Sequence, residues 1–353
     1  GLVFAFFVPG APREGLAQNA ISPTVSSARF ACNLKWLKIY FHYRNGLPAE
    51  VTNILQSVSN YYNCQFTEDI TVHINFDYQP LASGILAQAS RDTVMMPYKS
   101  VRSKLLNKTN FEAKLMQLHP VDDTISLFST GGVRIVSQLQ LTRANAKALG
   151  LLNPNDGAED SAITFSSSFA WSFDEFQGIP NTYSLFSVIV HEVGHALGFV
   201  SGVDSSEVPT LLDAYRHSDE SLTTGRPSIS WLPDEREPTC DVPKYFFTSP
   251  IDMNPNSKTC VLAGGCNKFV EYSKGKKNGC DSQGSHWRDG QNIGIMDPTF
   301  APQEFNGLSG NDILAFFYMG WTPSDITILY KPGQLPGPVF DCSAPGANCV
   351  ELP

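Results

Sequence analysis

The feature that most constrains this chain is a pair of histidines four residues apart on a predicted helix. The motif HEVGH (residues 191–195) lies inside SLFSVIVHEVGHALGF, whose apolar periodicity is typical of a buried helix. Residues four apart share one helix face, so His191 and His195 can reach the same metal ion, although two core histidines without a metal are the open alternative. Glu192 lies beside them, where its carboxylate can take a proton from a metal-bound water. Gly198 then permits a sharp end to the helix.

A catalytic zinc ion has three protein ligands and a water, so a third ligand is needed. The compact arrangement places a histidine six residues after the second one, but Ser201 stands there and Asp204 breaks the spacing. The third ligand must therefore come from elsewhere. His286, in the segment GSHW, is the favoured candidate, and His217 is the fallback.

A methionine-containing segment, IMDP, follows ten residues after His286. Taken together, HEVGHALGF, a long insertion, SHW and IMDP resemble the leishmanolysin-like branch of the metzincin zinc peptidases, in which an insertion separates the second and third zinc histidines. The segments LLDAYRHS, GIMDPTF and SGNDILAFFYMGW are also similar to that group, and the likeness spans about residues 34–322.

This resemblance implies one catalytic Zn²⁺ held by three histidines, and it assigns Glu192 as general base and acid. The implied ligands are His191, His195 and His286. Met296 would lie in a tight turn beneath the metal without binding it, although a plain core methionine is the alternative. Some metzincins carry a tyrosine ligand two residues after that methionine, where this chain has Pro298, so no such ligand is expected.

Hydrophobic patterning predicts an α+β fold with a twisted mixed sheet in the N-terminal lobe, and the resemblance implies that this fold is metzincin-like. The active-site helix would follow the sheet, and the C-terminal lobe would be irregular and stapled by disulfides. Strands are expected at 34–43, 70–78 and 162–166, and a strand or strand-to-helix passage at 133–141. Helices are expected from 48 to 62, 98 to 107, 143 to 149 and 309 to 320, with a turn or loop at 82–89.

The chain divides into four predicted parts. Residues 1–30 contain the apolar run LVFAFFV and read as the remnant of a secretory leader, with a buried first strand as the alternative. Residues 31–200 form the predicted catalytic lobe, and 201–330 form a lobe with a cysteine-rich insertion. Residues 331–353 form a tail rich in proline.

The composition of the chain argues against some classes of binding partner. The net charge of −9 argues against a protein that mainly grips nucleic acid or an anionic membrane. No apolar stretch approaches the roughly 20 residues of a transmembrane helix. We therefore expect no nucleic-acid partner and no transmembrane segment. The resemblance implies protein or peptide substrates, and we expect a secreted monomer.

Eight cysteines and one glycosylation sequon at Asn107 fit a secretory route. A Cys32–Cys64 disulfide is favoured over the alternative that Cys32 caps the zinc from a propeptide. Calcium binding is left open.

Other conspicuous residues have plainer interpretations. His73 lies on an alternating strand and is expected to be structural. Asp213 and Arg216 could form a buried pair, but surface positions are favoured for both. The lysines of residues 274–277 are expected at a solvated loop tip.

The leading hypothesis is a secreted zinc endopeptidase that binds an extended peptide along the sheet edge by strand addition. One rival is a gluzincin, for which Glu220 is the only reasonably spaced third ligand, although its surroundings do not look helical. Another is a zinc-retaining adhesin or binding protein that no longer cleaves. The presence of Glu192 argues against this second rival.

Overall fold

The structure is a computed structural model that describes residues 36–108, 123–129, 132–204, 208–216, 269–273, 275 and 282–324, with short strands at 19–21, 229–230, 244–247 and 350–351. It combines helices with a mixed sheet, so the predicted α+β class is confirmed at this level. Most of the predicted leader and tail lies outside these residues. The four predicted parts therefore stay predictions.

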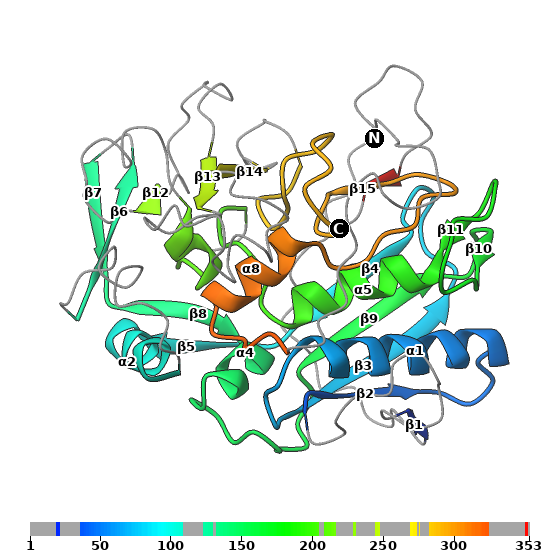
Figure 1. The fold of residues 1–353 in the computed structure, drawn as a ribbon, viewed down its shortest axis with the longest axis horizontal. Helices are drawn as coiled ribbons and strands as arrows, with labels where there is room; N and C mark the ends of the chain where they lie inside the picture. The colour runs from blue at the N-terminus through cyan, green and yellow to red at the C-terminus, as the bar shows by residue number, and fades with distance from the viewer. Residues whose placement is uncertain are drawn as a thin grey trace.

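The largest sheet in the described part of the chain has five strands, in the order β1-β2-β3-β9-β4, and lies beneath helices α1 and α5 (Figure 1). β2, β3 and β9 run parallel, while β1 and β4 pair antiparallel at the two edges. The strands alternate as their sequences predict, because every second residue of β3 faces the core. Their bounds are β1 Asn19–Ile21, β2 Lys38–Tyr43, β3 Thr71–Gln79, β4 Ala87–Arg91 and β9 Ser161–Ser166.

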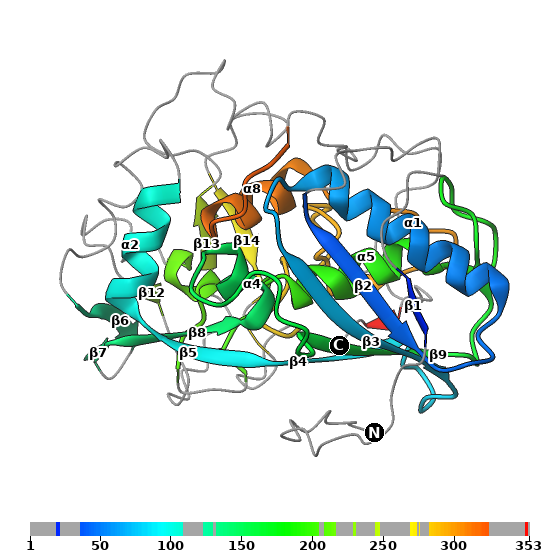
Figure 2. The same ribbon diagram turned by 90° about the horizontal axis from the view of Figure 1, so that it is seen from below.

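Two helices cover one face of this sheet. α1 (Ala49–Gln65) contacts β2, α5 (Leu185–Ala196) contacts β4, and the helices contact each other (Figure 2). α1 begins after Pro48, as predicted, and buries its apolar face. The Tyr62 hydroxyl donates a 2.6 Å hydrogen bond to the carbonyl of Val190, which fixes α1 against the helix of the HEVGH motif.

The remaining helices and strands lie beside this sheet and its two helices. The helices are α2 Tyr98–Lys108, α4 Arg143–Ala148, the 3₁₀ helix η1 Leu212–Tyr215 and α8 Gly310–Tyr318. The smaller sheets contain β5 Thr93–Pro97 with β8 Gln138–Thr142, and β6 Ile125–Ser129 with β7 Gly132–Val136 and β12 Ile229–Ser230. Two-stranded pairs are β10 Trp171–Ser172 with β11 Tyr183–Ser184, β13 Lys244–Phe247 with β14 Phe269–Tyr272, and β15 Thr299–Phe300 with β16 Val350–Glu351.

Two segments differ from the sequence-based expectation. The turn or loop expected at 82–89 ends inside the edge strand β4, whose sequence AQASR alternates alanine with polar residues but contains no large apolar or β-branched residue. The segment 133–141 contains two strands, β7 and β8, which belong to different sheets and are separated at Ser137. β7 pairs with the preceding strand β6 in a hairpin, whereas β8 pairs with β5, far earlier in the chain, so the local pattern could not separate the two strands.

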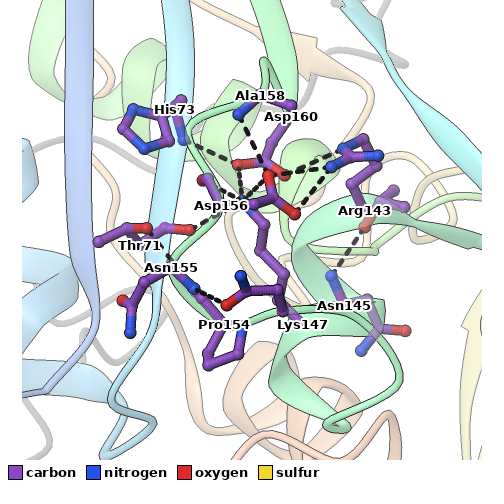
Figure 3. A network of polar contacts seen from close by, with 12 residues as sticks. Thr71, His73, Arg143, Asn145, Lys147, Pro154, Asn155, Asp156, Ala158 and Asp160 are labelled. Carbon is purple, nitrogen blue, oxygen red and sulfur yellow. Dashed lines mark hydrogen bonds and ion pairs between the residues drawn. The ribbon is translucent and has the colours of Figure 1, made fainter.

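A buried polar network joins α4 to the central sheet (Figure 3). The Lys147 ammonium is fully buried and lies 2.7 Å from Asp160 Oδ2, which also accepts the backbone N–H of His73. Arg143 donates to both carboxylate oxygens of Asp156 at 3.0 Å. Burying such charges requires this pairing, and the network fixes the end of β3 relative to α4.

One apolar core contains residues from both predicted lobes, from Leu37 near the start of β2 to Trp321 after α8. In the described part of the chain, no helix combines the length and apolar character needed to span a membrane.

Candidate metal centre

Helix α5 positions the first two histidines. It begins at Ser184, whose hydroxyl accepts the backbone N–H of Ser187 at 3.2 Å. Gly198 follows the helix with a φ of 123°, a conformation that favours glycine. The chain turns there so that the carbonyl of Phe199 lies 2.7 Å from Nδ1 of His195.

The third histidine comes from the loop between β14 and β15. His286 Nε2 lies 3.3 Å from His191 Nε2, and His195 Nε2 lies 3.0 Å from the same atom. The three ligand atoms all lie within 4.8 Å of one another, and all three side chains are buried. These histidines are therefore close enough to bind one metal ion, and in the described part of the chain they are the one such group of His, Cys, Asp or Glu.

The hydrogen bonds of the three imidazoles leave their Nε2 atoms able to bind a cation. The Nδ1 atoms of His191, His195 and His286 lie 2.7, 2.7 and 3.2 Å from the backbone oxygens of Ile295, Phe199 and Gln283 respectively. A carbonyl only accepts, so each Nδ1 carries the hydrogen and each neutral ring turns an Nε2 lone pair toward the other two.

Burial keeps the rings of His191 and His195 neutral, because it lowers the pKa of His191 to about 4 and that of His195 well below its usual range. Three facing lone pairs repel unless a cation lies between them. The separations of 3.0 and 3.3 Å from His191 Nε2 to the other two Nε2 atoms are compatible with a tetrahedral metal ion whose bonds to nitrogen are about 2.0–2.1 Å.

The carboxylate of Glu192 is fully buried without a hydrogen bond to any described residue. Burial raises its pKa to about 8, and the positive charge of Arg91 opposes this shift. Both oxygens are therefore available to exchange a proton with a ligand.

Met296 packs directly against the helix that carries two of the histidines. A Cβ atom placed on Gly194 would lie 2.6 Å from Met296 Sδ, so only glycine allows this approach. The backbone N–H of Trp287 donates to the carbonyl of Met296 at 2.9 Å, which pairs the His286 segment with the methionine segment.

Sequence reasoning did not find the role of Asp312. This buried residue caps α8, and its Oδ2 accepts the backbone N–H of Ser309 at 2.7 Å. The same oxygen accepts the N–H of Ile295 at 2.9 Å, and Oδ1 accepts the indole N–H of Trp287 at 2.7 Å. Asp312 thus holds the residue whose carbonyl orients His191 and the residue that follows His286. Ser309 three residues earlier indicates a capping box, but no local pattern reveals the two distant contacts.

Asp213 and Arg216 are buried, so the preference for surface positions was wrong. Arg216 Nε lies 3.3 Å from Asp213 Oδ1, and the guanidinium also donates to the carbonyls of Ser273 and Gly284 at 2.9 and 2.5 Å. Asp213 accepts four further hydrogen bonds, from Ser201 Oγ, Gly202 N, Thr210 N and Thr210 Oγ1. These contacts satisfy the buried charges and tie η1 to the segment that carries His286.

Some of the remaining candidate residues lie in the described part of the chain and others lie outside it. Ser201, excluded as a ligand from the sequence, donates its hydroxyl to Asp213 at 2.6 Å. His73 lies on β3, where its Nδ1 is 2.8 Å from His42 Nε2. Cys64 is disulfide-bonded, to a partner outside the described residues, so its predicted pairing with Cys32 stays a prediction. Residues Cys32, His217, Glu220, Lys274, Lys276 and Lys277 also lie outside the described part.

No family model, no curated protein and no solved structure matches this chain.

Proposed function

We propose that this chain is a zinc-dependent endopeptidase of the metzincin type, similar to the leishmanolysin-like branch. The observation that carries the proposal is the convergence of three buried imidazoles beside a buried carboxylate that has no hydrogen-bond partner among the described residues. The HEVGH motif and the packing of Met296 beneath its helix add support. The cysteines and the sequon support secretion.

The ligands would be His191, His195 and His286. Zinc bound there would lower the pKa of a bound water and polarise the scissile carbonyl. Glu192 would accept the proton of the attacking water and deliver it to the leaving amine. The carbonyls that accept from the three Nδ1 atoms keep the rings in orientation throughout.

The edge of the central sheet offers a place for an extended peptide. β4 is the last strand in the described order of that sheet, and it contacts α5, which carries Glu192. Backbone groups along the outer edge of β4 would pair with a substrate strand.

Casein hydrolysis tests the proposal. Wild type and Glu192→Ala are compared with and without o-phenanthroline, before and after limited proteolysis, and zinc is measured in each sample. We expect chelator-sensitive cleavage by wild type that Glu192→Ala abolishes while it keeps its zinc. Equal cleavage by both proteins would refute the assigned base. Stable zinc without hydrolysis in any wild-type sample would favour the non-cleaving binding protein.

Zinc content tests the third ligand independently of activity. His286→Ala should lower bound zinc sharply, because two imidazoles hold the ion much less tightly than three. The control is His217→Ala, which should leave about one zinc per chain. The reverse result would transfer the ligand role to His217.

A further inference from the structure

An arginine on the edge strand faces the same side as the metal centre. Along β4, Ala87 is fully buried, Gln88 and Ser90 are exposed, and Ala89 and Arg91 are half-buried. Since side chains alternate along a strand, Arg91 projects with Ala87 toward the face that α5 covers. Its backbone lies opposite Ser161 of β9, so the register places it at the end of the edge strand.

The guanidinium of Arg91 has no partner of its own within the described residues. It forms neither an ion pair nor a hydrogen bond there, although its charge acts on Glu192 and on His195. Its pKa, lowered by burial to about 10, leaves it charged at neutral pH. A half-buried cation with open N–H donors is suited to an anionic ligand, and the planar fork of arginine matches a carboxylate in particular.

We propose that Arg91 determines specificity by binding the carboxylate of an aspartate or glutamate next to the scissile bond of the substrate. This inference rests on the proposed peptidase function. A peptide paired with β4 would place every second side chain on the face that Arg91 shares with the metal centre. Arg91 would thus select acidic peptides over neutral or basic ones.

A binding measurement tests this separately from hydrolysis. Fluorescent octapeptide pools with a fixed central glutamate are compared with matched pools carrying glutamine or lysine. Anisotropy titrations use the full chain with zinc bound and Glu192→Gln to prevent cleavage. We expect the glutamate pool to bind at least about tenfold more tightly than the glutamine pool, since a hydrogen-bonded ion pair contributes at least that much.

Adding Arg91→Gln should abolish this ratio, and Arg91→Glu should reverse the preference toward the lysine pool, with zinc content unchanged in both. Arg44→Gln, at an exposed position after β2, is the matched control and should keep the preference. Equal binding of the pools, no binding of any pool, or a preference that survives Arg91→Glu would overturn the inference. Failure of wild type to hydrolyse casein, with the pool preference intact, would instead count against the peptidase function alone.

Discussion

The indole of Trp287 donates a 2.7 Å hydrogen bond to Asp312 Oδ1, which connects the residue after His286 to the capping box of α8. Asp312 also holds the N–H of Ile295, whose carbonyl accepts from His191. One buried carboxylate on the last described helix therefore orients two of the three histidines.

Asp312→Asn should weaken zinc binding by about 10–100-fold, because partners that orient metal ligands typically contribute that much. An amide keeps the shape but cannot accept all three hydrogen bonds as well as a carboxylate. Competition with a fluorescent chelator measures the affinity. Asp123→Asn, at an exposed position, is the control and should leave the affinity unchanged. Equal affinity for Asp312→Asn and wild type would remove Asp312 from the support of the site.

Gly194→Ala should destabilise the protein by about 1–3 kcal/mol, because the added methyl group would lie 2.6 Å from Met296 Sδ. Combining it with Met296→Ala should cost less than the sum of the two single changes, since the shorter side chain leaves room. Urea unfolding measures all three variants. Gly157→Ala, where the new Cβ meets nothing within 4 Å, is the control. Strict additivity would show that the two residues do not compete for space.

Local sequence patterns predicted the helices α1, α5 and α8 because each carries an apolar face and a clear start. Ser184 before α5 and Ser309 before α8 supply the N-caps that a sequence reader can recognise. The strand β3 was predicted from its strict alternation, and β2 from a mixture of alternating and β-rich residues. The spacing of His191 and His195 likewise required only helical geometry.

Contacts between distant segments could not be predicted in this way. His286 was suggested by a resemblance, and its approach to His191 depends on how the loop after β14 packs. Arg216 looked like a surface residue because its acceptors, the carbonyls of Ser273 and Gly284, lie far along the chain. The strand β4 gave no clear strand signal because its alternating apolar positions are only alanines, which are weak strand formers.

Arg216→Met should destabilise the protein by about 3–5 kcal/mol, because it leaves the buried carboxylate of Asp213 without its charge partner. It should also lower zinc affinity, since Arg216 holds the carbonyl of Gly284, two residues before His286. Urea unfolding and chelator competition measure the two effects. Arg44→Met, at an exposed position, should change neither. A stable Arg216→Met protein that retains zinc would show that this ion pair does not support the site.

Acid should destabilise the folded protein through His73. Burial, followed by the nearby His42 and Lys147, lowers the pKa of His73 to about 4, against 6.5 for a free side chain. Between these two values the unfolded chain binds a proton that the folded protein does not bind, so the free energy of unfolding falls as the pH drops from 6.5 to 4. Protonation of both His73 and His42 would place an N–H on each side of the 2.8 Å contact between His73 Nδ1 and His42 Nε2, so this contact can hold only one of the two rings charged.

His73→Asn should therefore lose less stability than wild type over this pH range, by about 1 kcal/mol once solvent screening of the half-buried ring is considered. Urea unfolding at pH 6.5 and at pH 4.5 measures the difference between the two proteins. Gln79→Asn, at the exposed end of the same strand, serves as the control because it removes no titrating group. A His73→Asn protein that loses as much stability as wild type would show that the acid sensitivity arises at other groups.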